Sequence, residues 1–573
     1  MALLASWRFI IKNLKSKTVD REIFSFGESG ERDRRTDRRL EQLWVFGLLL
    51  AALLLYGINL DGVPLRDWDE GIVAHVARDI WRGNLNWLHP TLAGEPYFNK
   101  PPLVHLLIAI AYSAGGVSEL MARLPPATVS AFSVPLLYGV GREVFPRRTP
   151  AIFAALIYLT LLPVVRHGRL AMLDGPVLCF SLLMLWCLLR SRRDLRFGLG
   201  AGIGLGLVCL TKGVLGLLLG AIAAVFIAWD TPRLLRSWYL WAGLLLGAVP
   251  AAAWYAAQWQ HYGQQFIQEH FFSQSLQRLW LPVGNNAGPP WYYLLEIVKY
   301  SGPWLLFWPQ GLRLAWENRN LGFGKLVLVW GGLYLLAISV MRTKLPWYVL
   351  PVYPALALAG GALLAEVWGR RARAFPTFSY SVSFPLYPSR RAWVAAFALL
   401  AVAGLAGSLY FGGLGPQTER YLQLALGCAA LTMAAVAVLV SREDPQFILV
   451  LFWGCYVSLT LFVSSNSWVW ELAEDYPVLP VAAMVQQHAP AGVPVRTSHP
   501  YSRPSLNFYS DRQVIPAPDS ELQRHWQQDS QPYLLLDRPA LEKLGLQKVK
   551  PLATADGWML LARNKLQSSS RLH

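Results

Sequence analysis

Long apolar runs recur through this 573-residue chain, and they constrain its fold more than any other feature. Runs of roughly 18–20 residues can cross the hydrocarbon core of a bilayer as helices. In hydrocarbon, only a helix or a closed barrel satisfies every backbone hydrogen bond. The runs therefore predict an all-α polytopic membrane protein with about 13 transmembrane helices. Their predicted bounds are 42–60, 124–142, 149–165, 174–190, 197–211, 213–229, 237–257, 291–309, 324–341, 347–368, 393–411, 421–441 and 446–464.

The N-terminal region and the cysteines narrow the class further. About 40 polar residues precede the first run and no small-residue cleavage site follows it, so we expect an anchor rather than a cleaved signal peptide. All five cysteines lie inside apolar runs. Their placement argues against a disulfide framework and against a cysteine-based metal site.

The formal net charge of +17 comes from basic clusters that lie between the apolar runs or before the first one. This is the positive-inside pattern of membrane proteins, so the charge predicts no nucleic-acid partner. The short run Leu103–Ala114 breaks the pattern if it crosses the membrane, and keeps it if it lies in the outer interface. We therefore predict a multi-pass protein of the plasma (inner) membrane, with a cytoplasmic N-terminus and an extracytoplasmic C-terminus. The clusters are Arg32–Arg39, Arg142–Arg148, Arg190–Arg196, Arg233–Arg236, Arg313–Lys325, Arg370–Arg373 and Arg390–Arg391.

Composition divides the chain into three predicted segments. Residues 1–41 form a basic cytoplasmic segment, and residues 42–465 form the transmembrane domain. That domain contains a first outer loop at 61–123 and a Pro- and Ser-rich cytoplasmic linker at 370–391. Residues 466–573 turn polar and are predicted to form a small α/β domain outside the membrane. Its predicted elements are the strands Val493–Thr497, Gln513–Ile515 and Tyr533–Leu536 and a helix at Pro539–Leu544.

The first outer loop carries two adjacent carboxylates, Asp69 and Glu70. If residues 69–82 form a helix, one face is apolar, with Asp69 in its middle and Arg78 opposite. A carboxylate directed toward a buried face is costly unless it has a partner or a task. The alternative is that Asp69 is the N-cap of this helix, and the pattern leaves both interpretations open. The apolar face consists of Ile72, Val73, Val76 and Ile80.

Several other polar residues fall on the outer side under the same topology. The motif Thr343–Tyr348 and the preceding Arg342 place basic residues where the charge rule predicts few, which suggests a bound anion. Phosphate is the anion that a membrane offers at that depth. Arg342, Lys344 and Lys212 could supply charge to it, and Tyr348 a hydrogen bond.

Some of these positions also have ordinary structural interpretations. Asp174 opens a span as Leu-Asp-Gly-Pro, which is a usual helix start. Lys100 could be an interfacial lysine whose charge reaches the headgroups. Glu269 and His270 could bind a metal ion, but two adjacent residues are weak evidence for a metal site. We therefore predict no required cofactor, and a divalent metal at this pair is the weaker hypothesis.

An ordered set of motifs resembles the GT-C glycosyltransferases, within the group that contains protein O-mannosyltransferases and the lipid A aminoarabinose transferase. Each motif is weak alone, but their order over about residues 42–365 is specific. The set begins with Asp69-Glu70 and continues with Tyr97–Leu103 (YFNKPPL), Ala122–Pro125 (ARLP), Arg169–Asp174 (RLAMLD), Leu210–Gly213 (LTKG) and Thr343–Tyr348 (TKLPWY).

The resemblance implies a polyprenyl-phosphate-linked sugar donor and catalysis at the outer face of the membrane. By motif position, it implies catalytic aspartates at Asp69 and Asp174 and a phosphate-contacting lysine at Lys100. It also implies a GT-C architecture for the transmembrane domain.

Two positions depart from the aminoarabinose enzyme. Asn99 stands where that enzyme has an acidic metal ligand, whose partner ligand would match His270. Val73 stands near the position of its first-loop arginine. Asn99 weakens the case for a bound metal ion, and Val73 leaves the identity of the acceptor open.

The leading hypothesis is an inverting hexosyl- or pentosyltransferase that moves a sugar from polyprenyl phosphate to an extracytoplasmic lipid, glycan or protein acceptor. Basic residues and Tyr348 would hold the leaving phosphate and stabilise its charge. Asp69, with Glu70 beside it, would deprotonate an acceptor hydroxyl, and Asp174 would orient the acceptor or assist Asp69. An acceptor that is itself a phosphate needs no base, and Asp69 would then position it.

The rival hypothesis is a transporter or flippase of lipid-linked sugars, with the same anion site but no chemistry. Transporters often carry internal repeats and charges in the middle of the membrane. In this chain the charged set lies at the ends of the predicted spans on one side, which favours an enzyme.

Overall fold

The structure is a computed structural model that describes residues 30–282, 286–369, 390–416, 418–469 and 478–563. It consists of two compact units, residues 1–47 and 48–573, and helix α2 (Gly30–Gly57) begins in the first of them. Most of the predicted N-terminal segment 1–41 and of the linker 370–391 lies outside the described residues. Every site discussed below belongs to the second unit.

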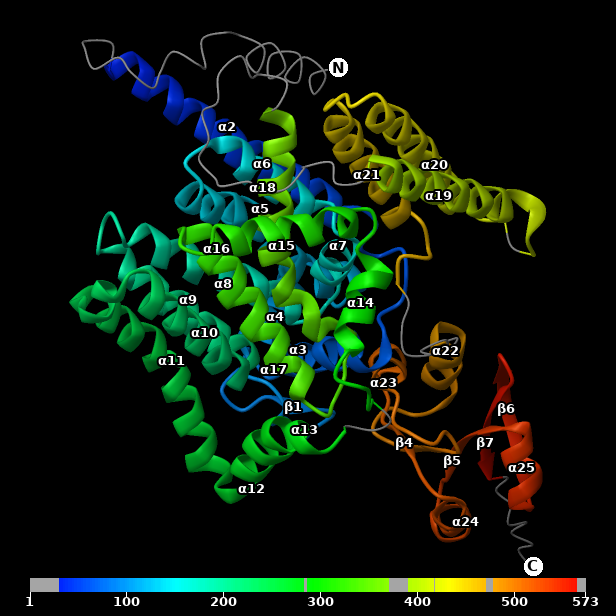
Figure 1. Cartoon of the computed structure of the whole chain (residues 1–573). Coiled ribbons are helices and arrows are strands. Elements are labelled where there is room, and N and C mark those ends of the chain that lie inside the picture. Colours follow the sequence, from blue (N-terminus) through cyan, green and yellow to red (C-terminus); the bar gives the residue numbers. More distant parts are fainter. Residues whose placement is uncertain (1–29, 283–285, 370–389, 417, 470–477, 564–573) are drawn as a thin grey trace, which may run out of the picture. The chain divides into compact units, whose positions relative to one another are not determined.

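The second unit is mainly helical, which confirms the predicted fold class (Figure 1). Among the described residues, seven helices are long and apolar enough to cross a membrane, or eight if one bent pair counts as a single span. The predicted number of about 13 crossings is therefore not confirmed. The seven are the Asp37–Gly57 part of α2, α5 (Glu119–Val144), α11 (Trp238–Tyr262), the continuous α16 (Gly322–Leu326), η6 (Val327–Leu333) and α17 (Tyr334–Val340), the continuous η7 (Pro346–Val352) and α18 (Tyr353–Gly369), the continuous α19 (Arg390–Leu409) and η9 (Tyr410–Leu414), and α20 (Arg420–Ser441).

Two predicted spans are interrupted by proline. The span 149–165 is divided into α6 (Arg148–Leu159) and α7 (Leu162–Arg169), which meet at an angle of 60°. Pro163 lies in the first turn of α7, where its missing N–H leaves no bond unmade, but it could not continue α6. The span 291–309 is likewise divided, and Gly302-Pro303 lies at the break. Its parts are α14 (Tyr292–Tyr300), η5 (Trp304–Phe307) and α15 (Trp308–Glu317).

Four further apolar helices are shorter than a full span. Helix α4 (Leu103–Gly115) has 13 residues and is about 20 Å long, whereas the hydrocarbon core is about 30 Å thick. Its length agrees with the expectation that this run does not cross. The other three are α9 (Phe197–Lys212), α10 (Val214–Asp230) and α21 (Phe447–Val463).

The first outer loop folds into a π-helical turn η2 (Asp67–Gly71), helix α3 (Ile72–Arg82) and a small hairpin. Of the predicted apolar face of α3, Val73, Val76 and Ile80 are buried, whereas Ile72 is half-buried. Arg78, expected on an open face, is also buried, because the C-terminal domain covers that side and Phe508 O accepts a hydrogen bond from it. The hairpin and the other described helices are β1 (Thr91–Leu92), β2 (Glu95–Pro96), α8 (Asp174–Arg190), η3 (Pro232–Arg236), α12 (Gln264–Phe266), η4 (Ile267–Leu276) and α13 (Gln277–Trp280).

The predicted C-terminal α/β domain is confirmed as a five-stranded sheet in the order β4-β3-β5-β7-β6. Strand β3 is parallel to β4 and β5, and β7 is antiparallel to β5 and β6. The strands are β3 (Val495–Thr497), β4 (Val514–Pro516), β5 (Tyr533–Asp537), β6 (Val549–Ala555) and β7 (Trp558–Arg563), and the helices are α22 (Val478–His488), α23 (Pro504–Ser510), α24 (Asp519–Gln528) and α25 (Arg538–Leu544).

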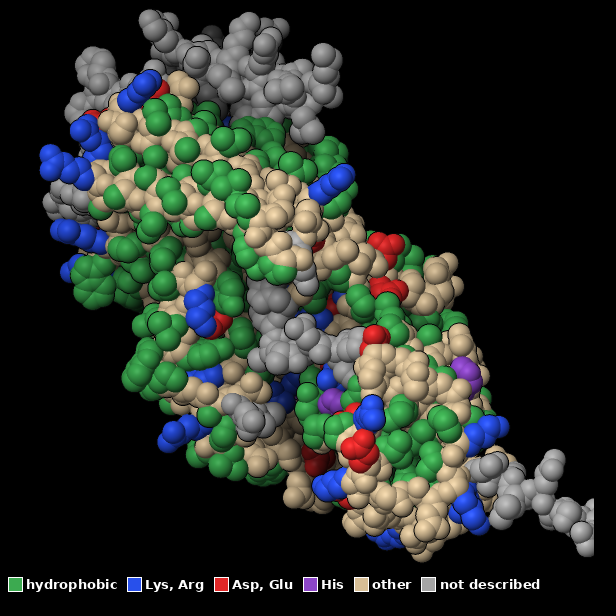
Figure 2. All heavy atoms as spheres, turned by 90° about the vertical axis from the view of Figure 1, so that its right-hand side faces the viewer, with side chains coloured by type: hydrophobic (Ala, Val, Ile, Leu, Met, Phe, Trp, Pro, Cys, Tyr) green, Lys and Arg blue, Asp and Glu red, His purple; other side chains and the backbone are tan. Residues whose placement is uncertain are grey.

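Two kinds of surface are visible in the second unit. Figure 2 shows hydrophobic side chains over α19 and α20 and mixed acidic and basic side chains over the C-terminal domain. Leu399, Val402 and Leu431 are 65–75% exposed. Exposed apolar helices suit a lipid environment, whereas a mixed charged surface suits water.

Candidate functional site

The candidate site begins at η2, which holds Asp69. The N-cap of this turn is Arg66, whose carbonyl accepts a hydrogen bond from Gly71 N at 2.7 Å, and the N-cap of α3 is Gly71. The interpretation of Asp69 as an N-cap is therefore wrong. Asp69 is half-buried, and its charge adds to the effect of burial in raising the pKa of the Tyr97 phenol.

Glu70, the other predicted carboxylate, is fully buried and anchored. Its two oxygens accept hydrogen bonds from Arg123 Nε and Nη2, both at 2.7 Å. They also accept from Ala171 N at 2.7 Å and Arg66 N at 3.2 Å. Burial raises the pKa of Glu70, but the arginine and these hydrogen bonds outweigh it and hold that pKa below its usual value. These contacts give Glu70 a structural role, in which it fixes the position of the turn.

The arginines of two sequence motifs hold the backbone that precedes this turn. Arg123 Nη1 donates to the carbonyls of Leu60 and Val63, each at 2.7 Å. Arg169 Nη1 donates to Leu55 O at 2.7 Å, so it satisfies a carbonyl near the end of α2 that the helix leaves unpaired. Both guanidinium groups stack on the buried ring of Trp468.

Asp174 and Lys212 form an ion pair that joins two helix ends. Lys212 is the last residue of α9, and Asp174 is the first residue of α8; the N-cap of α8 is Leu173. Lys212 Nζ lies 2.6 Å from Asp174 Oδ1. Gly213 follows with a φ of +59°, and a Cβ there would lie 2.9 Å from Tyr255 Oη, so both the turn and the packing favour glycine.

Tyr348 and Arg278 complete a group of polar side chains around this pair. Lys212 Nζ lies 5.5 Å from the centre of the Tyr348 ring, and Arg278 Nη1 donates to Tyr348 Oη at 3.0 Å. Lys100 lies near enough to interact with their charges. Burial, Arg278 and Lys212 lower the pKa of Lys100 to about 7, which Asp174 partly opposes. We call Lys100, Asp174, Lys212, Arg278 and Tyr348 the cationic group.

Arg278 was not among the phosphate contacts predicted from the sequence. It lies outside every motif that the resemblance rests on. Its neighbour Gln274 Oε1 accepts a hydrogen bond from Nη2 at 2.5 Å and so orients the guanidinium group toward Tyr348.

Two predicted phosphate contacts lie outside the cationic group. Arg342 is exposed. Lys344 is 3% exposed, and its Nζ donates to Ile338 O at 3.1 Å and to Ser339 O at 2.7 Å. It therefore satisfies carbonyls at the end of α17.

Glu269 and His270, the tentative metal ligands, also differ in their surroundings. Glu269 is exposed, whereas His270 is 2% exposed. The ring nitrogens of His270 lie 2.6 Å from Phe98 O and 3.1 Å from Tyr255 Oη. Burial, more than the opposing bond to Phe98, lowers the pKa of His270 to about 4, so the imidazole is neutral. Glu269 points to solvent while His270 is buried, so the two do not share a site, and the described residues contain no group of three or more His, Cys, Asp or Glu side chains that could hold a metal ion.

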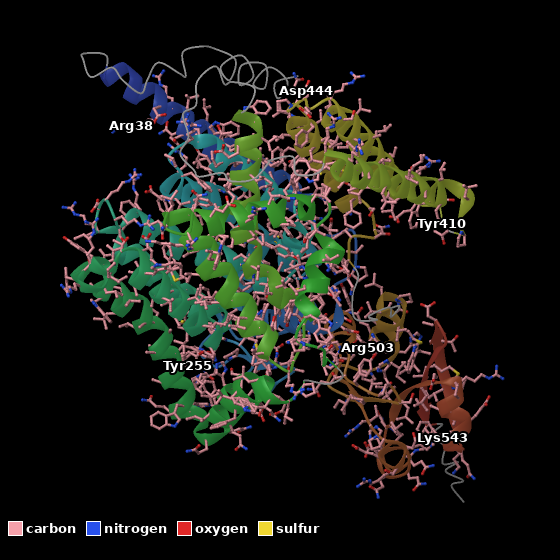
Figure 3. All side chains as sticks on the ribbon, in the orientation of Figure 1. Arg38, Tyr255, Tyr410, Asp444, Arg503 and Lys543 are labelled. Atoms are coloured by element: carbon pink, nitrogen blue, oxygen red, sulfur yellow. The ribbon has the colours of Figure 1, made fainter. Side chains whose placement is uncertain are left out.

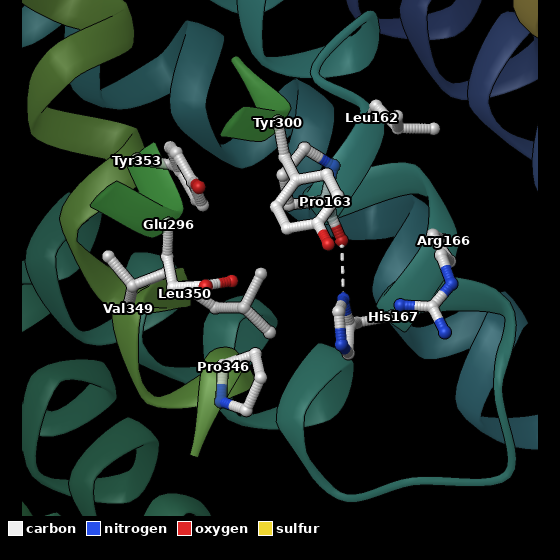
Figure 4. A pocket seen from close by; sticks show the side chains of 10 residues that line it. All are labelled: Leu162, Pro163, Arg166, His167, Glu296, Tyr300, Pro346, Val349, Leu350 and Tyr353. Atoms are coloured by element: carbon white, nitrogen blue, oxygen red, sulfur yellow. Dashed lines mark hydrogen bonds between the residues drawn. The ribbon is translucent and has the colours of Figure 1, made fainter. Parts of the chain in front are cut away.

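A narrow cavity of about 20 Å³ lies between α7, α14 and η7 (Figure 4). His167 Nδ1 lies 2.9 Å from Pro163 O at its edge. This volume holds about one water molecule, so the cavity is too small for a sugar. The candidate site is therefore the cationic group with the Asp69 turn.

Comparison with known proteins adds independent findings on the sequence. Residues 99–256 match the family model described as dolichyl-phosphate-mannose-protein mannosyltransferase. The chain is 30% identical over 338 residues to undecaprenyl phosphate-alpha-4-amino-4-deoxy-L-arabinose arabinosyl transferase 1 of Pseudomonas fluorescens, which covers 56% of this chain and 60% of that relative. The corresponding transferase of Aeromonas salmonicida is 30% identical over 332 residues, covering 55% and 59%. The chain thus matches less than two thirds of the length of these relatives.

The fold is similar to that of a solved structure. The crystal structure of ArnT from Cupriavidus metallidurans bound to undecaprenyl phosphate has a TM-score of 0.73 and 18% identity, and the match covers 91% of this chain and 98% of that chain. The apo structure of the same protein gives a TM-score of 0.72. These findings confirm the resemblance to the GT-C group that contains the mannosyl- and aminoarabinosyltransferases, and they confirm the fold.

Proposed function

We propose that this chain is a glycosyltransferase of the inner membrane that takes a sugar from a polyprenyl-phosphate donor at the outer face. The observation that carries the proposal is the cationic group, in which Lys212 pairs with Asp174 and lies beside Tyr348. Arg278 donates to Tyr348, and Lys100 interacts with the charges of Arg278, Lys212 and Asp174. Such a group at the ends of apolar helices suits a phosphate that is attached to a lipid. The matches to undecaprenyl-phosphate-dependent relatives support the same donor class.

In the proposed reaction, an acceptor oxygen attacks the anomeric carbon while the bond from that carbon to the phosphate oxygen breaks. The bonding electron pair leaves with polyprenyl phosphate, so negative charge grows on the phosphate. Lys100, Lys212 and Arg278 would stabilise that charge more strongly in the transition state than in the bound donor. A single displacement of this kind inverts the configuration at the anomeric carbon.

Asp69 is the proposed general base, which would take the proton of an acceptor hydroxyl. Such a group typically contributes roughly 10²–10⁴-fold to the rate. If the acceptor is a phosphate that is already ionised, Asp69 would position it instead. Asp174, held by Lys212, would keep the ammonium group aligned and orient the acceptor.

The printed names of the relatives suggest undecaprenyl phosphate 4-amino-4-deoxy-L-arabinose as the first donor to test. The resemblance suggests lipid A as the first acceptor. Val73, near the position of the relatives' first-loop arginine, argues for testing other lipid, glycan and protein acceptors beside it. No nucleic acid enters the proposal, and the outward orientation of the site is part of it.

The test is an assay of the purified protein with a panel of polyprenyl-phosphate sugars, following release of polyprenyl phosphate and transfer of the sugar. Transfer with at least one donor is the expected result. Movement of intact lipid-linked sugar across proteoliposomes, with no release of polyprenyl phosphate, would instead establish the transporter or flippase alternative.

A further inference from the structure

The C-terminal domain bonds directly to the turn that carries Asp69. Asp67 is 4% exposed, and its Oδ2 accepts a hydrogen bond from Arg503 Nη1 at 2.5 Å. Its Oδ1 accepts from Ser505 N at 3.2 Å and also from the Ser505 hydroxyl. Arg503 lies where the C-terminal domain approaches the outer loop (Figure 3). His499 Nε2 accepts from Arg503 Nε at 3.0 Å, which fixes the orientation of the guanidinium group.

Further contacts lie on both sides of Asp67. Tyr509 Oη accepts a hydrogen bond from Leu65 N at 2.7 Å, and Phe508 O accepts one from Arg78 at 2.7 Å. A Cβ on Gly71 would lie 2.8 Å from Ser505 N, so α23 packs closely on the turn. Helix α23 therefore contacts the chain before, within and after η2.

The opposite side of the turn is held by the transmembrane domain. Glu70 is bound by Arg123 of α5, whereas Asp67 is bound by Arg503 of the C-terminal domain. Asp69 lies between these two buried ion pairs. Because the pairs restrain the backbone from two directions, the position of the Asp69 carboxylate depends on both.

The junction beside the turn combines polar and apolar contacts. A cavity of about 280 Å³ lies between α3 and the C-terminal domain, and charged side chains line it, including Arg78, Asp79, Arg82 and Asp511. Phe508 is the buried α23 residue that joins the apolar cluster around Val73 and Val104. Apolar packing is non-directional, so the hydrogen bonds to Asp67 are the contacts that fix the orientation of the domain on the turn.

We infer that the C-terminal domain is a positioning element of the active site, in which Arg503 and Ser505 hold Asp67 and thereby place Asp69. This role rests on the proposed function, in which Asp69 is the catalytic carboxylate. Arg503, Ser505 and Asp67 are positioning residues, because they act on the acceptor through Asp69.

The test compares Arg503→Ala, Arg503→Lys and Ser505→Ala in the full-length protein. Arg503→Ala should lower kcat at least about tenfold and leave the donor KM within about twofold, since the cationic group is untouched. Arg503→Lys, which keeps one charged donor, should recover part of the lost kcat. The matched control is Arg496→Ala, which removes a partly exposed ion pair with Glu521 in the same domain and should change neither constant.

Amide hydrogen exchange of residues 66–72 provides a readout that does not need activity. Exchange there should accelerate in Arg503→Ala and Ser505→Ala but not in Arg496→Ala. Wild-type exchange and wild-type kcat in Arg503→Ala would overturn the inference, as would an equal loss in the control. If Arg503→Ala does not fold, Ser505→Ala decides by the same measurements. A protein without transferase activity would refute the proposed function, whereas the exchange result would still decide whether the domain holds the turn.

Discussion

Three carboxylates lie between residues 67 and 70, and their surroundings give them different chemistry. Asp67 and Glu70 are buried, and each is bound by an arginine from another part of the fold. Asp69 is half-buried in the same turn and lies near Tyr97. A carboxylate on a turn held by two buried pairs has little freedom to move, which is what the proposed role of Asp69 as a positioned base requires.

Asp69→Asn tests the central residue of the proposed reaction. Because Asp69 is not the N-cap of α3, the substitution should leave the start of that helix unchanged. We expect normal expression, nearly normal thermal melting and a rate lowered at least about 100-fold. The rate is measured as release of polyprenyl phosphate. Full activity in this variant would remove Asp69 from the mechanism.

The pH dependence of donor use should report Lys100, whose pKa is lowered to about 7. The lysine is charged below that value and neutral above it, so it loses its attraction for phosphate as the pH rises. In the free enzyme, kcat/KM for the donor should therefore fall through about pH 7 toward pH 9. The arginine in Lys100→Arg keeps its charge over this pH range, so this variant should not show the fall in kcat/KM. If kcat/KM of Lys100→Arg falls with pH as in the wild type, the titrating group is not Lys100.

Sequence reasoning identified Asp69, Asp174, Lys100, Lys212 and Tyr348 as candidates, and the last four lie together in the structure. It could not separate Glu70 from Asp69, because the anchor Arg123 is 53 residues away. It also missed Arg278 and did not show that the Lys344 ammonium binds carbonyls at the end of the preceding helix α17. Contacts between distant segments decide the cases of Glu70 and Arg278, and no local spacing records them. The Lys344 contacts are only five and six residues apart in sequence, but they depend on where α17 ends.

The geometry of the site depends on hydrogen bonds and turns at the ends of its helices. Arg123 of α5 reaches the carbonyls of the loop after α2, and Gly213 makes the turn between α9 and α10. Both residues lie inside motifs that the family resemblance rests on. Their contacts give these two motif residues structural roles.

Arg123→Ala should be strongly destabilising, because it leaves the buried carboxylate of Glu70 without its partner. Breaking a buried pair costs about 3–5 kcal/mol. The side chain of Arg193, which pairs with Glu143, is 64% exposed, and Arg193→Ala should cost less than about 1 kcal/mol. Thermal melting of the two purified variants in the same detergent compares them. Equal melting temperatures would contradict the structural role of Arg123.

Gly213→Ala should disturb the cationic group without removing any of its side chains. The residue has a φ of +59°, and a Cβ would lie 2.9 Å from Tyr255 Oη and 3.3 Å from His270 Nε2. We expect lower stability and a raised donor KM, because Lys212 precedes the strained turn. Gly263→Ala is the control, since its φ is +58° and no atom lies within 4 Å of a Cβ there. A donor KM that rises equally in both variants would exclude a specific effect on Lys212.

A comparison of the predicted spans with the observed helices shows which apolar runs predicted a helix correctly and which did not. Runs at 237–257 and 421–441 predicted α11 and α20 closely, and α11 remains one helix although it contains Pro250. Runs that contain Pro163 or Pro303 were read as single spans although the structure breaks them. The hairpin β6-β7 was missed, even though Asp556-Gly557 at its turn, both with positive φ, is a strong local signal for a hairpin.

The proposed orientation of the protein in the membrane can be tested directly. Single cysteines at the exposed positions 193, 342 and 543 would report on three parts of the chain. We expect a membrane-impermeant maleimide added from outside to label 342 and 543 but not 193. The native cysteines are buried or half-buried, which should keep the background low. Labelling of 342 only from the cytoplasmic side would refute the outward site.

The arginines that bind the end of α2 have a consequence for how the protein meets bilayers of different thickness. Arg169 and Arg123 fasten the carbonyls of Leu55, Leu60 and Val63 to α7 and α5, so protein contacts rather than lipid headgroups decide where the first outer loop begins. A helix held only by the bilayer responds to hydrophobic mismatch by tilting or sliding. Here the depth of the Asp69 turn is set from inside the protein, and we expect turnover to change by less than about twofold as acyl chains are lengthened across the range of natural membranes.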